Sequence, residues 1–171
     1  GRRRSEVHTG IPVITASTPA DSAPTGDNAG SYPWTVADAI GTTLKVRVSQ
    51  VTDSTVTDKS DLDFTIKGSL SLTAPNGAEQ LPIASAQAIA WNKTGSLTGN
   101  ATLEYSADGG VTYPVANLIS STAAVAGATG VCTPPSGGGC FAWTVPDNPT
   151  AQARVKITYQ ADTSVNDASD A

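Results

Sequence analysis

Residues 34–61, WTVADAIGTTLKVRVSQVTDSTVTDKSD, align without a gap with residues 143–170, WTVPDNPTAQARVKITYQADTSVNDASD. The matched pairs are Trp34 with Trp143, Asp38 with Asp147, Val46 with Val155, Val48 with Ile157, Asp53 with Asp162, Val56 with Val165, Asp58 with Asp167, Ser60 with Ser169 and Asp61 with Asp170. A register held over this length predicts two copies of one module of about 110 residues, an array rather than a single-purpose enzyme. The second copy looks nearly complete, whereas the first lacks its front half.

The repeat divides the chain into three predicted segments. They are an N-terminal arm with partial strands (residues 1–31), the C-terminal half of a first module (32–67) and a second module that lacks its last strand (68–171). That last strand is visible only in the first module, where Leu62, Phe64 and Ile66 alternate. Only Gly68 separates the two modules, and so short a joint predicts modules that stack into a rod.

Short alternating runs separated by Gly, Pro, Asn and Asp predict strands, and no helical periodicity lasts for three turns. The strands expected in the second module are 70–73, 88–91, 101–106, 111–115, 141–145 and 153–159. Asn76-Gly77 and Asp108-Gly109-Gly110 are expected to be turns, because these residues adopt positive φ. The spacing predicts an all-β fold of tandem immunoglobulin-like antiparallel β-sandwich modules, the first of them incomplete. Trp91 and Trp143 are expected to be core aromatics.

Charge and hydrophobicity along the chain argue against some classes of function. The net charge of −5 argues against nucleic acid, whose phosphates reward clustered Lys and Arg. The one basic run, Arg2-Arg3-Arg4, is expected to be a solvated tail. No run reaches the roughly eighteen apolar residues of a membrane span, and no signal peptide is recognised. We therefore expect a mature or excised piece of a protein that is secreted or held at the cell surface.

Two cysteines, Cys132 and Cys140, flank the stretch TPPSGGG, which looks too flexible to hold itself. An oxidised pair would close this loop, as expected in an export compartment, and two free thiols are the alternative. Zinc needs four ligands, and nothing nearby supplies the other two, so no metal is expected at this loop.

Several pieces of the chain resemble one family of repeats. They are Pro75-Asn76-Gly77-Ala78-Glu79, Ala90-Trp91, Glu104-Tyr105-Ser106, Trp143-Thr144-Val145-Pro146-Asp147 and the closing stretch from Ser164 to Asp170. Over 68–171, and as a half copy over 32–67, the chain resembles the Kre9/Knh1-like repeat, an immunoglobulin-like β-sandwich of fungal cell-wall glycoproteins and large prokaryotic surface proteins. The resemblance implies a surface spacer, adhesive or assembly unit without catalytic residues. This copy departs from the pattern at Ala78, where a second Gly is usual, and in the loop between the cysteines.

Other motifs have both a functional and a structural interpretation. Residues 106–113, SADGGVTY, fit an Asp-box, which in other proteins is a structural hairpin. The cluster Asp162, Asp167 and Asp170, like its first-module counterpart Asp53, Asp58, Asp61 and Asp63, offers hard oxygen ligands for calcium, although Asp also favours turns. Asn92-Lys93-Thr94 and Asn100-Ala101-Thr102 are glycosylation sequons, which matter only in an organism that modifies them.

No enzyme and no cofactor are expected, because an active site needs a base, a nucleophile or paired carboxylates within reach. The only histidine, His8, lies in the arm, and Glu6, Glu79 and Glu104 are scattered. The first hypothesis is a structural module of a surface fibre, sheath, layer or adhesin, whose partners are copies of itself or other surface proteins. The alternative is a module that binds cell-wall polysaccharide, for which the candidate aromatics are Tyr32, Trp34, Tyr113 and Tyr159.

The N-terminal arm suggests how copies would join. Val7, Thr9, Ile11 and Val13 alternate along one face of an extended segment. Because the second module lacks its last strand, its backbone groups and core groove need another partner. We predict that the arm adds as a strand to a neighbouring subunit, where Pro12 is tolerated at an edge position. The alternative is that the arm reflects only a fragment boundary.

Overall fold

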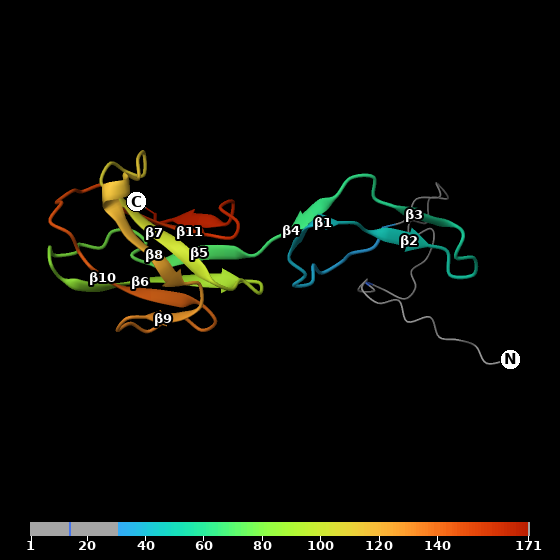
Figure 1. Cartoon of the computed structure of the whole chain (residues 1–171), viewed down its shortest axis with the longest axis horizontal. Coiled ribbons are helices and arrows are strands. Elements are labelled where there is room, and N and C mark those ends of the chain that lie inside the picture. Colours follow the sequence, from blue (N-terminus) through green and yellow to red (C-terminus); the bar gives the residue numbers. More distant parts are fainter. Residues whose placement is uncertain (1–13, 15–30, 171) are drawn as a thin grey trace. The chain divides into compact units, whose positions relative to one another are not determined.

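The computed structural model describes Ile14 and residues 31–170. These residues form twelve strands and one short 3-10 turn, η1 (Val115–Asn117), with no α-helix among them. The strands are β1 (Gly41–Leu44), β2 (Arg47–Ser49), β3 (Thr57–Lys59), β4 (Phe64–Ile66), β5 (Ser69–Ala74), β6 (Ala86–Thr94), β7 (Asn100–Ser106), β8 (Leu118–Ala124), β9 (Gly127–Thr129), β10 (Gly139–Thr144), β11 (Arg154–Tyr159) and β12 (Asn166–Ala168). The all-β prediction is confirmed (Figure 1).

The chain divides into two compact units. One consists of the described residues up to Ala37 together with Lys45–Asp63, and its strands β2 and β3 form an antiparallel hairpin. The other consists of Asp38–Leu44 and the chain from Phe64 onward. It contains the antiparallel pair β1–β4 and two four-stranded sheets.

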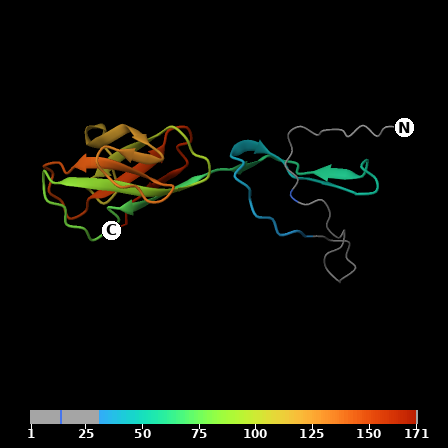
Figure 2. The ribbon, with the colours of Figure 1, turned by 90° about the horizontal axis from the view of Figure 1, so that it is seen from below.

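These two sheets, which we call the two-sheet body, have the strand orders β5-β6-β10-β9 and β12-β11-β7-β8 (Figures 1 and 2). The alternation of apolar and polar residues that predicted the strands also turns one face of each sheet toward the core. In β5, Leu70 and Leu72 are buried while Ser69 and Ser71 are exposed. Both sheets contribute to one hydrophobic cluster. Its members are Leu70, Leu72, Ile89, Trp91, Leu97, Ala101, Leu103, Ala123, Val125, Val155, Ile157 and Val165. Burying each large aliphatic side chain stabilises the fold by about 1.5–3 kcal/mol.

Of the two tryptophans expected in the core, one is fully enclosed. Trp91 has no exposed surface, and its indole Nε1–H donates a hydrogen bond to the carbonyl oxygen of Val125 (3.0 Å). Trp143 is half-buried at the margin of the cluster, with its ring centroid 6.2 Å from that of Tyr105.

One expected strand is wrong. Residues 111–115 form no strand, and the chain returns along β7 only at β8. The Asp108 carboxylate accepts a hydrogen bond from the Thr112 backbone N–H (2.9 Å), which holds this segment in a loop. Pro114 has no N–H for a ladder, and η1 follows it. The turn is therefore longer than a tight hairpin.

The sheets are also not wholly antiparallel. β9 pairs with β10 in parallel, with Gly127 opposite Gly139 and Thr129 opposite Phe141. Parallel neighbours usually need a crossover of about a dozen residues or more, yet only residues 130–138 connect these two. The disulfide described below closes this connection.

Candidate functional site

The two halves of the sequence repeat form the same hairpin. In the first copy Arg47 lies opposite Lys59, Val48 opposite Asp58 and Ser49 opposite Thr57. In the second copy the pairs are Lys156 with Ala168, Ile157 with Asp167 and Thr158 with Asn166. Each pair of the second hairpin occupies the positions that the alignment assigns to the first, so β2–β3 and β11–β12 share one register.

The turns of these hairpins also agree in their side-chain contacts. Asp53 Oδ1 accepts hydrogen bonds from the backbone N–H (3.0 Å) and the hydroxyl (2.6 Å) of Thr55. Asp162 Oδ1 accepts the same two bonds from Ser164, at 3.0 and 2.7 Å. In both turns the bond from the hydroxyl is the main cause that lowers the pKa of the aspartate. These aspartates therefore act as turn formers.

A serine closes each hairpin at its open end. Ser60 N–H donates to the carbonyl oxygen of Val46 (2.9 Å), and its Oγ accepts from the Val46 N–H (3.3 Å). Ser169 makes the same pair of bonds with Val155, at 2.8 and 3.1 Å. The repeated Asp and Ser positions thus have a common structural role, which the alignment alone did not reveal.

The three carboxylates considered for calcium serve different protein partners. Asp162 holds its turn, Asp167 Oδ2 accepts from the Leu72 backbone N–H (2.7 Å), and Asp170 Oδ2 lies 3.4 Å from Asn76 Nδ2. Within residues 31–170, no three His, Cys, Asp or Glu side chains are grouped as metal ligands. Calcium binding by these three carboxylates stays a prediction.

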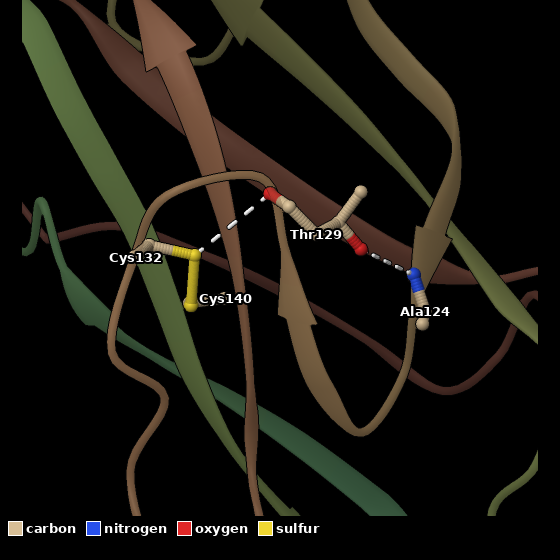
Figure 3. The surroundings of a disulfide bond; sticks show 4 residues. All are labelled: Ala124, Thr129, Cys132 and Cys140. Carbon is tan, nitrogen blue, oxygen red and sulfur yellow. Dashed lines mark hydrogen bonds between the residues drawn. A yellow bond between two sulfur atoms is a disulfide. The ribbon is translucent and has the colours of Figure 1, made fainter.

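The disulfide between Cys132 and Cys140 is confirmed, and free cysteines are absent from this two-cysteine chain. Cys140 is fully buried on β10, and the bond ties the connection after β9 to it (Figure 3). Figure 3 also shows Thr129, whose hydroxyl accepts a hydrogen bond from the Ala124 N–H (3.3 Å) and whose carbonyl oxygen lies 3.8 Å from the Cys132 sulfur. The bond and these contacts hold β9 between β8 and β10.

The Asp-box segment is a closed loop built around one carboxylate. Asp108 accepts hydrogen bonds from the hydroxyls of Ser106 and Thr112, both at 2.5 Å, and from the Thr112 backbone N–H. These bonds, the one from the Ser106 hydroxyl foremost, lower the pKa of Asp108 from 3.8 to about 2. Every partner lies within the loop, so the carboxylate serves the loop's own conformation.

The sequon asparagines both lie on strands. Asn92 is in β6 and Asn100 begins β7, and both residues are exposed. Their modification stays a prediction.

The four aromatics considered for sugar binding are not gathered at one place. Tyr32 is exposed, and together with half-buried Trp34 it lines a hollow of about 340 Å³. Tyr113 lies under the ammonium of Lys156, which is 4.1 Å from its ring centroid. Tyr159 donates its hydroxyl to the carbonyl oxygen of Thr98 (2.8 Å). Only Tyr32 and Trp34 form a shared concave surface.

One contact of the structure could not be predicted from the sequence. The Asp38 carboxylate accepts hydrogen bonds from the Ser96 backbone N–H (3.0 Å) and hydroxyl (2.5 Å), at the turn between β6 and β7. The side-chain bond from Ser96 is the main cause that lowers the pKa of Asp38. The alignment matched Asp38 with Asp147, yet the partner lies on a segment that has no counterpart in the repeat.

The predicted inter-subunit strand, Val7, Thr9, Ile11 and Val13, lies outside the described residues, as do Glu6 and His8. Across the described part of the chain, no helix is long and apolar enough to cross a membrane.

Comparison of the chain with protein-family models, with curated proteins and with solved structures finds no match. The resemblance to the Kre9/Knh1-like repeat therefore stays a prediction.

Proposed function

We propose that this protein is a non-catalytic structural component of an extracellular fibre, sheath, layer or adhesin, built from immunoglobulin-like β-sandwich modules. The observation that carries the proposal is the hairpin formed twice, with one register, one turn and one serine closure. Repetition of one structural unit is typical of arrays, in which each unit supplies shape and contact surface.

Two further observations support a location outside the cell. Cys132 and Cys140 form a disulfide. Disulfides persist in oxidising compartments and are rare in the cytosol. The resemblance of residues 68–171 to modules of wall and surface proteins points the same way. We therefore propose that the protein is secreted or held at the cell surface.

Assembly would proceed by strand addition from the arm to a neighbouring copy. The test replaces Val7, Ile11 and Val13 together by serine, which removes the apolar alternation but keeps the backbone. The matched control replaces Arg2, Arg3 and Arg4 by serine, an equal number of changes in the same arm. Polymer length is measured by light scattering and electron microscopy over a range of concentrations.

We expect the control to assemble and the valine–isoleucine variant to remain monomeric, with the circular dichroism of the two-sheet body unchanged. Polymers of equal length from both variants would refute strand addition by the arm. A wild-type chain that stays monomeric at every concentration would refute the structural function.

A second function is favoured by one observation, the hollow lined by Tyr32, Trp34 and the neighbouring Pro33, Thr35, Ala37 and Ile14. Aromatic rings beside polar groups are suited to the apolar faces and hydroxyls of a polysaccharide. Retention on cell-wall polysaccharides should fall when Tyr32 and Trp34 become alanine, and not when Tyr113 does. No retention of the wild-type chain on any wall polysaccharide would remove this alternative.

A further inference from the structure

We propose that the outer edge of β2 is an acceptor for an added β-strand that is supplied from outside residues 1–171 and has the chemistry of β7. The strand would pair antiparallel with β2, place a leucine against Val48 and set a glutamate beside Arg47. This inference rests on the proposed modular repeat and names the partner of its first copy.

The apolar face of β2–β3 is bare, whereas its counterpart is covered. Val46, Val48 and Val56 are 38%, 62% and 55% exposed, while the matching Val155, Ile157 and Val165 are 3%, 0% and 4% exposed. Both hairpins have the same register, so the difference comes from what packs on them and not from how they are built. A two-stranded hairpin with an exposed apolar row is marginal in water and gains stability from a further strand.

The covered copy shows which strand belongs at this edge. There β7 pairs antiparallel with β11, with Lys156 opposite Glu104, Ile157 opposite Leu103 and Val155 opposite Tyr105. Leu103 is fully buried in this arrangement. Along the described chain β2 pairs with β3 alone, so the edge that corresponds to the β7 side of β11 has no strand.

Charge identifies the strand further. Lys156 forms an ion pair with Glu104, with 3.0 Å between Nζ and Oε2. The repeat keeps a positive charge at this position as Arg47, and no carboxylate of the described residues forms an ion pair with it. A cross-strand pair of opposite charges stabilises a sheet by about 0.2–1 kcal/mol, and like charges destabilise it. Arg47 therefore selects a strand with a carboxylate one residue away from the leucine.

The test uses the full chain and a capped synthetic peptide with the sequence of residues 99–107, GNATLEYSA. Binding is followed by NMR as shifts of backbone amides during titration. We expect saturable shifts centred on Lys45–Gln50, with the shifts at Val155–Tyr159 small because β11 already has its strand. Shifts that spare β2, or none up to the solubility limit of the peptide, would overturn the proposal.

A charge exchange makes the test specific. Arg47→Glu should weaken peptide binding about tenfold, and a peptide with Lys in place of Glu should recover that loss. Lys67→Glu makes the same change of charge in the other unit and should leave affinity unchanged. Equal effects of Arg47→Glu and Lys67→Glu, or no recovery by the exchanged peptide, would mean that Arg47 does not select the strand.

The arm of the same chain is the competing occupant. If it covered β2, the serine variant of Val7, Ile11 and Val13 would bind the peptide more tightly than the wild type does, and this result would overturn the proposal. If the chain binds the peptide but never assembles, the structural function is refuted and the proposal of an acceptor edge at β2 still holds. Arm-dependent assembly without peptide binding at β2 would refute the acceptor edge alone.

Discussion

Trp91 explains why glycines occupy the end of the cysteine loop. A Cβ at Gly138 would lie 2.1 Å from the Trp91 carbonyl oxygen, and a Cβ at Gly139 would lie 2.5 Å from the indole ring. Both glycines are buried, so this part of the stretch TPPSGGG is required by packing and is not a flexible spacer. The sequence-based interpretation of the whole stretch as too flexible to hold itself was wrong at these two positions.

Gly139→Ala should therefore destabilise the fold by about 1–3 kcal/mol, because the added methyl group overpacks a rigid indole. Ser136→Ala, an exposed change in the same loop, is the control and should cost less than about 0.5 kcal/mol. Urea unfolding followed by tryptophan fluorescence measures both. Equal midpoints for the two variants would contradict this account of the glycine.

Ala78 occupies a left-handed backbone conformation, with φ of 62°. It follows Gly77 in the turn after β5, where Glu79 accepts hydrogen bonds from the N–H groups of Asn76 and Gly77. An alanine in this conformation is strained by about 1 kcal/mol, a cost that glycine avoids. Ala78→Gly should raise the free energy of unfolding by up to about 1 kcal/mol, whereas Ala86→Gly on strand β6 should lower it by about 0.5–1 kcal/mol. Thermal unfolding compares them, and destabilisation by both changes would refute the strain at Ala78.

The lowered pKa of Asp108 makes the free energy of unfolding depend on pH in the acid range. The pKa of Asp108 is about 2 in the folded protein and about 3.8 when the chain unfolds, so the unfolded chain binds the proton more tightly. The stabilisation is complete above about pH 4 and is lost as the pH falls toward about 2. Asp108→Asn should reduce the fall in the denaturation midpoint over this range, and Asp147→Asn, an exposed change outside the loop, should not. The remaining fall is expected from Asp38, Asp53, Asp162 and Glu79, whose pKa values are also lowered.

At the scale of elements, the disulfide stabilises the short connection between the parallel strands β9 and β10. It closes the segment between Cys132 and Cys140, which are 8 residues apart in sequence, next to the β9–β10 pair. Closing a loop of this length restricts the unfolded chain and is worth about 2–3 kcal/mol. The double variant Cys132→Ala and Cys140→Ala should lose that stability, and amide exchange should quicken first at Gly127–Thr129. Uniform acceleration over all strands, with no preference for β9, would show that the bond does not hold this strand in particular.

At the scale of the whole molecule, the two hairpins test how far stability depends on packing. β2–β3 and β11–β12 have the same backbone pairing, but only the second lies in the hydrophobic cluster. Amides of β2–β3 should therefore exchange with solvent about a hundredfold or more faster than those of β11–β12 in the isolated chain. Hydrogen exchange followed by NMR measures the two sets in one experiment. Equal protection would mean that hairpin propensity, and not the core, determines their stability.

Much of the fold could be predicted from the sequence because strand signals are local. Alternation placed β5, β6, β7 and β11, and Trp91 was correctly assigned to the core. The return strand after residue 110 was placed too early, because a side chain of the loop competes for the backbone of Thr112. The parallel pairing of β9 was missed, because strand direction depends on residues far apart in the chain.

What the sequence determined by itself was the repeat, the all-β class and the pairing of the only two cysteines. These follow from alternation, turn residues and proximity, which are written into neighbouring positions. Only the tertiary structure decided that Val48 is bare and Ile157 covered, that Asp38 holds Ser96 and that Gly139 makes room for Trp91. Burial and long-range hydrogen bonds depend on which segments meet in space, so two aligned stretches with the same backbone pairing can still differ in what packs on them.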